Sequence, residues 1–264
     1  MHTVNVVKTK NKPLKLLSVI RLPWLLFTLL VFTILIKLGL WQTARADEKL
    51  LRLANIEQLK SQQSLSLEQV ITLVNTNQTK EAKKFAEAIN DLPINITATF
   101  DSKHVFLLDN QTNKNSLGYR VFQVAQSDKQ VFLVNLGWIE GSVNRHDLPS
   151  FTPLTGTYQF SGHVRVMEKG IVLQEQQFNN VQWPLRVQQI EVNKLSPLIG
   201  EKLLPFVVYL DKNEAIGFVK NWHPVVMPPE KHQAYAFQWF SLALAWLILM
   251  SWAAIKNATK TNPE

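Results

Sequence analysis

The chain has 264 residues, of which 46% are hydrophobic and 18% charged, so it has ample apolar side chains for a folded core and is not a disordered or low-complexity protein. Its formal net charge is +8, but the excess flanks two apolar segments, while residues 42–233 hold nearly equal numbers of acidic and basic side chains. This distribution is typical of a membrane protein and argues against nucleic acid as a partner.

Residues 1–21 are basic and contain no acidic side chain. Their positive charges come from Lys8, Lys10, Lys12, Lys15 and Arg21. Because lysine and arginine are enriched on the cytoplasmic side of membrane helices, this segment is predicted to be a cytoplasmic tail.

The first apolar segment, residues 22–41, is interrupted only by Lys37. A helix of about 20 residues is about 30 Å long, which matches the hydrocarbon thickness of a bilayer. Trp24 and Trp41 lie near its two ends, where aromatic rings favour the membrane interface. The segment is therefore predicted to be a transmembrane helix, and the spacing of charges after Trp41 predicts that the helix continues beyond it.

A cleavable signal peptide is the alternative interpretation of this segment. Ala44-Arg45-Ala46 fits the small-x-small pattern that precedes cleavage sites. However, the apolar core of a signal peptide is usually about 7–15 residues long, and this apolar run is longer. Its length favours an uncleaved membrane anchor.

The second apolar segment, residues 234–255, contains no charged side chain. Tyr235 and Trp239 lie near one end and Trp252 near the other, as in an aromatic belt. We predict a second transmembrane helix, followed by a cytoplasmic tail at 256–264. Both termini are then cytoplasmic, and the expected location is a bacterial inner membrane with residues 42–233 in the periplasm.

The segment between the spans is predicted to be helical over residues 42–92 and rich in β-strands over residues 93–222. Ser66, with Gln69 three residues later, predicts a helix start, and a second amphipathic helix is expected at 79–90. Expected strands, separated by turn residues, are Ile94–Phe100, Val105–Leu108, Tyr119–Ala125, Val131–Trp138, Tyr158–Met167, Phe178–Val181, Phe206–Leu210 and Ile216–Val219.

The predicted fold class is an α+β membrane protein. A two-helix transmembrane hairpin carries a periplasmic domain made of an antiparallel β-sheet or small β-barrel, with flanking amphipathic helices. No nucleophile elbow, zinc-protease, phosphate-loop or dinucleotide motif occurs, and the chain has no cysteine, so the sequence does not support an enzyme.

His232 precedes the second span and shares a helix face with Tyr235 and Trp239. A neutral imidazole there can serve as an axial ligand to a haem at the membrane edge. On the residues alone, an interfacial histidine in an aromatic belt is the simpler interpretation. Near the first span, Gly39 permits close helix approach, and Arg45 is one turn from Trp41 and can stack on its ring.

Five segments carry a family resemblance: Leu38–Arg45, Gly118–Val121, Val131–Trp138, Ser161–Arg165 and His232–Phe240. Together with the two spans and the β-rich domain between them, they resemble the surfeit locus protein 1 family of cytochrome c oxidase assembly factors. The segment from His232 is the most specific match. One departure is Leu136, where the family usually has Arg in a V-N-R-G-W pattern, which puts in doubt any contact made through that Arg.

The resemblance implies an assembly factor that transiently holds haem A or delivers it to the catalytic subunit of haem-copper cytochrome c oxidase. The family's haem-ligand histidine matches His232, and Tyr235, Trp239 and Arg45 are the other expected cofactor-binding residues, with Arg45 or Lys49 meeting the propionates. Gly39, Trp41 and Gln42 carry over as motif residues whose role, packing or partner contact, stays open.

The implied partner is the oxidase catalytic subunit, with haem A synthase as a second candidate and membrane lipid around the spans. Two alternatives stay open. One is a haem-independent scaffold that stabilises an oxidase subunit, and the other is a periplasmic binder of lipid or quinone.

Overall fold

The computed structural model describes residues 22–142, 144, 147–167, 170, 176–178 and 181–260. The chain divides into two compact units. The helical unit comprises residues 1–53 and 225–264, and the β unit comprises residues 54–224.

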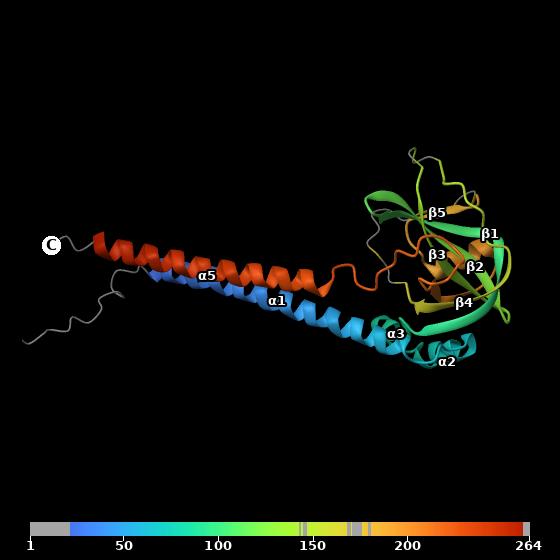
Figure 1. The fold of residues 1–264 in the computed structure, drawn as a ribbon, viewed down its shortest axis with the longest axis horizontal. Coiled ribbons are helices and arrows are strands. Elements are labelled where there is room, and N and C mark those ends of the chain that lie inside the picture. The colour runs from blue at the N-terminus through green and yellow to red at the C-terminus, as the bar shows by residue number, and fades with distance from the viewer. Residues whose placement is uncertain are drawn as a thin grey trace, which may run out of the picture. The chain divides into compact units, whose positions relative to one another are not determined.

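The helical unit contains α5 (Pro229–Lys260) and most of α1 (Leu22–Lys60), and the two helices lie side by side in it (Figure 1). Residues 54–60 of α1 belong to the β unit. By length and composition, both are apolar enough to cross a membrane, which agrees with the predicted two-pass arrangement. The indole Nε1 of Trp246 donates to the carbonyl of Thr28 at 3.1 Å. As the charge spacing predicted, α1 continues well past Trp41.

After the end of α1, the β unit has two short helices followed by strands. The elements are α2 (Leu67–Asn77), α3 (Ala82–Ile89), β1 (Pro93–Asn113), β2 (Ser116–Ser127), β3 (Gln130–Glu140), β4 (Gly156–Arg165), β5 (Leu185–Val187), α4 (Val192–Ile199) and β6 (Leu203–Leu210). The predicted start of α2 is confirmed: Ser66 Oγ accepts from the backbone N–H of Gln69, and Ser66 N–H donates to Gln69 Oε1. This capping box satisfies two amides at the helix start.

The six strands form one sheet in the order β2-β3-β6-β4-β1-β5, and β2 also pairs with β1. The predicted all-antiparallel pattern is wrong, because β3 pairs with β6 and β1 with β5 in parallel. Parallel neighbours need a long connection, and the chain from β3 to β6, which includes the unpredicted α4, supplies one. The sheet is therefore mixed.

Two predicted strands, Ile94–Phe100 and Val105–Leu108, are one continuous strand. A bulge between Phe100 and Val105 separates its two parts. Before the bulge β1 pairs with β4 over 93–100, and after it β1 pairs mainly with β2. A bulge bends a strand without ending it, so β1 contributes to two neighbourhoods of the sheet. The predicted strand Phe178–Val181 includes residues 179 and 180, which lie outside the described residues.

The segment predicted as a strand at Ile216–Val219 is instead a single bridge onto β3. The backbone N–H of Trp138 donates to the carbonyl of Val219, and that of Phe218 to the carbonyl of Leu136. Gly217 has φ +85°, and a Cβ there would lie 2.4 Å from the Leu136 carbonyl oxygen, so this close approach requires glycine. The Leu136 side chain is fully buried in the core, and it offers no surface contact to a partner.

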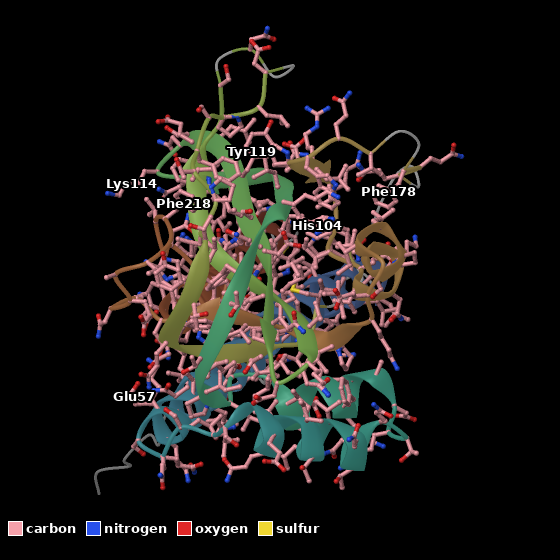
Figure 2. The ribbon with its side chains drawn as sticks, turned by 90° about the vertical axis from the view of Figure 1, so that its right-hand side faces the viewer. Glu57, His104, Lys114, Tyr119, Phe178 and Phe218 are labelled. Carbon is pink, nitrogen blue, oxygen red and sulfur yellow. The ribbon has the colours of Figure 1, made fainter. Side chains whose placement is uncertain are left out.

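Two apolar clusters hold the β unit together. Figure 2 shows the strands of this unit with α2 and α3 across one end. The larger cluster joins strand side chains to α2 and α3, with Phe132 and Phe160 among its largest members. The second includes Phe106, Phe122 and Tyr209, with partly buried Trp222 packed against it. The second cluster supports the polar groups described below.

Candidate functional site

The helical unit brings His232 of α5 and Gln42 of α1 together. The Nδ1 atom of His232 lies 2.7 Å from Oε1 of Gln42, and the histidine is only 9% exposed. An amide oxygen only accepts hydrogen bonds, so Nδ1 carries a hydrogen, and in the neutral imidazole Nε2 then has the lone pair. Within the described residues, Nε2 has no hydrogen bond.

This arrangement suits an iron ligand. Metal-bound histidines commonly donate their second ring N–H to an oxygen, which fixes the tautomer and the ring orientation. Gln42 provides that oxygen, and His232 is held in the first turn of α5, which begins at Pro229. The structure therefore gives the motif residue Gln42 a contact that sequence reasoning had not assigned.

The other residues predicted beside His232 do not share one environment. Ala236, one turn further along α5, is buried, whereas Tyr235 is 43% exposed and Trp239 is partly buried. A helix rotates by about 100° per residue, so Tyr235 lies to one side of the face that His232 and Ala236 occupy. Tyr235 is thus accessible beside the histidine.

Arg45 does lie over the ring of Trp41, with 5.9 Å from its guanidinium carbon to the ring centroid. Its Nη1 also bonds to the carboxylate of Glu48 at 2.6 Å, and the Lys49 ammonium approaches the same carboxylate at 3.4 Å. Sequence reasoning placed Glu48 on the charged stripe after Trp41 but did not predict its pairing with Arg45. Solvent screens an exposed ion pair of this kind, so it stabilises the fold little and another anion can replace Glu48.

Gly39 is a packing residue. A Cβ at this position would lie 2.5 Å from the ring of Phe240 on α5, so glycine allows the ring to rest on α1. This contact, the Trp246–Thr28 bond and the His232–Gln42 bond all join the two helices.

The sequence profile of the SURF1 family matches residues 29–244, most of the chain. The matched range includes both Gln42 and His232. The chain belongs to the SURF1 family. SURF1 proteins are associated with the assembly of cytochrome c oxidase and are assembly factors rather than a catalytic family. No curated protein matches the chain.

In this SURF1-family chain the β unit also contains a cavity of about 460 Å³. Its wall includes His163, whose Nδ1 lies 3.3 Å from Oδ1 of Asp211 and whose ring lies 4.6 Å from that of Trp222. The guanidinium of Arg165 lies 5.2 Å over Trp222 and bonds to the Asp91 carboxylate at 3.0 Å.

Tyr209 of β6 continues this cluster, with its ring 5.6 Å from that of His163. Burial raises the pKa of the Tyr209 phenol, although the positive charges of Arg120 and Arg165 oppose the shift. Burial likewise lowers the pKa of Arg120, whose guanidinium lies 5.8 Å over the Tyr209 ring. Burial in the folded state therefore disfavours the charged form of both the phenol and the guanidinium.

Sequence reasoning missed this cluster. The one local signal was the placement of His163 and Arg165 two residues apart, which puts them on the same face of a strand. Their partners Asp91, Tyr209 and Trp222 lie dozens of residues away along the chain. Tyr209 is opposite His163 where β6 pairs with β4, whereas Asp91 and Trp222 belong to connecting segments. Within the described residues, no group of three or more His, Asp or Glu side chains could hold a metal ion.

Proposed function

We propose that this chain promotes assembly of haem-copper cytochrome c oxidase by holding haem A at His232 and delivering it to the catalytic subunit. The observation that carries the proposal is the hydrogen bond from His232 Nδ1 to Gln42 Oε1. It orients the imidazole and leaves Nε2 as the atom that binds iron.

The neighbouring side chains support haem binding in different ways. Tyr235 and Trp239 offer aromatic contact to the porphyrin. Arg45 and Lys49 bind propionates by exchanging Glu48 for them, since charge-assisted bonds to carboxylates are favourable for both cations. Haem A is a cargo here, so weak and exchangeable contacts suit its release.

The proposed membrane placement follows the positive charges. The basic segment 1–21 and the tail that contains Lys256 lie in the cytoplasm, and residues 42–233 lie in the periplasm of a bacterial inner membrane. The oxidase catalytic subunit docks against the spans, whose outward side chains are apolar, and haem A synthase is the source of the cargo.

The test is an optical spectrum of the detergent-purified full chain after co-expression with the haem A pathway. We expect a haem A absorbance in the wild type and its loss in His232→Ala. His223→Ala is the matched control, because His223 is an exposed histidine of the β unit and its variant should keep the signal. An unchanged spectrum and oxidase yield in His232→Ala would overturn the proposal.

The same hydrogen bond also favours a second candidate function, a haem-independent scaffold for an oxidase subunit. In this case the His232–Gln42 bond holds the two helices together. Substitution of either residue lowers oxidase yield, and neither the wild type nor the variants contain haem. Identification of the small molecules that co-purify in the same samples tests the remaining alternative, that the chain binds lipid or quinone in the periplasm.

A further inference from the structure

We propose that the face of α1 turned away from α5 binds the headgroup of an anionic phospholipid between Lys37 and Arg45. Lys37 is the exception in the two predicted spans, 22–41 and 234–255, because no other residue there is charged. A charged side chain inside a membrane is costly and is usually paired. Lys37 is exposed and has no ion pair or hydrogen bond with any residue in the described part of the chain. An anion of the surrounding membrane can supply the missing partner.

Lys37 lies on the side of α1 that does not pack against α5. Gly39 marks the packed side, since a Cβ there would lie 2.5 Å from the ring of Phe240. A helix turns by about 100° per residue, so Lys37, two residues earlier, points about 200° away from that contact. Its side chain consequently faces lipid rather than the neighbouring helix.

Two further residues follow along the same face at intervals of one turn. Trp41 comes four residues after Lys37, and Arg45 four residues after Trp41, which brings their side chains into line. The Arg45 guanidinium lies 5.9 Å from the centroid of the Trp41 ring, so this side chain points back along the helix towards Lys37. Because a lysine near the end of a span extends its ammonium towards the interface, the two cations meet at the level of Trp41.

The level of Trp41 is suited to a lipid headgroup. Tryptophan is enriched at the membrane interface, and Trp41 is 52% exposed, so its indole N–H is accessible to donate to a phosphate oxygen. On the Leu22 side of Lys37, the same face carries exposed Leu30 and Ile34, which offer an apolar surface to an acyl chain. The face therefore combines cations for a headgroup with apolar side chains for a lipid tail, which a soluble anion would not use.

The charges of this face favour an anionic headgroup over a zwitterionic one. Arg45 pairs with Glu48 at 2.6 Å, but this carboxylate is exposed and can be exchanged for a phosphate. Both cations attract a headgroup that carries only the phosphate charge, whereas they repel the ammonium of a zwitterionic lipid. Each lysine or arginine near the membrane surface contributes enough free energy for about a fivefold preference.

The test uses the full chain made without haem A, because Arg45 also belongs to the proposed haem site. Native mass spectrometry of the detergent-purified chain measures the binding of phosphatidylglycerol and of phosphatidylcholine with the same acyl chains. We expect phosphatidylglycerol to bind at least about fivefold more tightly. Lys37→Met keeps an unbranched side chain but removes the charge, so it should reduce this preference about fivefold. Lys37→Arg should retain it.

Lys60→Met is the matched control, because Lys60 is an exposed lysine of the same helix beyond the apolar segment. Its lipid binding should equal that of the wild type. Equal binding of the two lipids by the wild type, or an unchanged preference in Lys37→Met, would overturn the proposal. A wild type without lipid preference, together with a lower oxidase yield in Lys37→Met, would also overturn it and would instead assign Lys37 to an acidic side chain of a membrane protein.

Discussion

His232 and Gln42 form a hydrogen bond between α5 and α1, with 2.7 Å between Nδ1 and Oε1, although they are separated by 190 residues in the chain. Gln42→Leu leaves a buried ring nitrogen without its partner, so we expect it to lower the free energy of unfolding by about 1–3 kcal/mol. Unfolding of the purified chain by SDS, followed by tryptophan fluorescence, measures this loss.

The double variant Gln42→Leu/His232→Leu is the control for this prediction. Replacing both polar partners by apolar side chains removes the unsatisfied group, so the double variant should be more stable than Gln42→Leu alone. If the loss in the double variant equals the sum of the losses in Gln42→Leu and His232→Leu, the hydrogen bond does not couple the helices.

Gly39→Leu should separate the two helices. A side chain at Gly39 collides with the ring of Phe240, and overpacking of this kind costs about 1–3 kcal/mol. Ala44→Leu is the matched control, because Ala44 is an exposed small residue on the same helix. In the same SDS unfolding measurement, Phe240→Ala should restore part of the stability of Gly39→Leu, and failure to do so would contradict the contact.

Local signals predicted some of these elements well. The apolar runs of the two spans depend on composition alone, and the Ser66–Gln69 capping box lies within four consecutive residues, so both were visible in the sequence. Gln42 and His232 were each recognised as motif residues, but nothing in the sequence indicated that they contact one another. A pair that forms across two helices depends on the helix register, which periodicity does not determine.

In the β unit, even more of the contacts between distant segments could not be predicted from the sequence. The parallel pairing of β6 with β3 depends on a long connection whose path has no local signature. The approach of Arg165 to Asp91 and of His163 to Trp222 likewise joins a strand to a distant connecting segment, so it could not be predicted. Alternation predicted most strand positions, but not which strands are neighbours.

The pair of Asp91 and Arg165 should contribute strongly to the stability of the β unit. Both side chains are at most 15% exposed, and breaking a buried pair by removing one charge costs about 3–5 kcal/mol. Asp91→Asn is suitable because Asn tolerates the positive φ of 68° at this position. We expect a loss of about 3 kcal/mol in denaturant unfolding, but less than about 1 kcal/mol for Asp211→Asn, whose side chain is 50% exposed. Similar losses in both variants would contradict the importance of burial.

Tyr209 should make the β unit sensitive to high pH. Burial raises the pKa of its phenol above the ordinary value of 10.0, so the native state keeps the phenol neutral while the unfolded state ionises near pH 10. The stabilisation is therefore complete below pH 10 and is lost as pH rises through the unfolded pKa, by up to about 1.4 kcal/mol per pH unit until the folded pKa is reached.

Tyr209→Phe removes this ionisation and keeps the ring. Between pH 8 and pH 11, the free energy of unfolding of the variant should fall less than that of the wild type, by up to about 1.4 kcal/mol. Because every other titrating group is common to both proteins, the difference between the two pH profiles isolates Tyr209. Parallel profiles would mean that the phenol ionises equally in the folded and unfolded states, which contradicts its burial between His163 and Arg120.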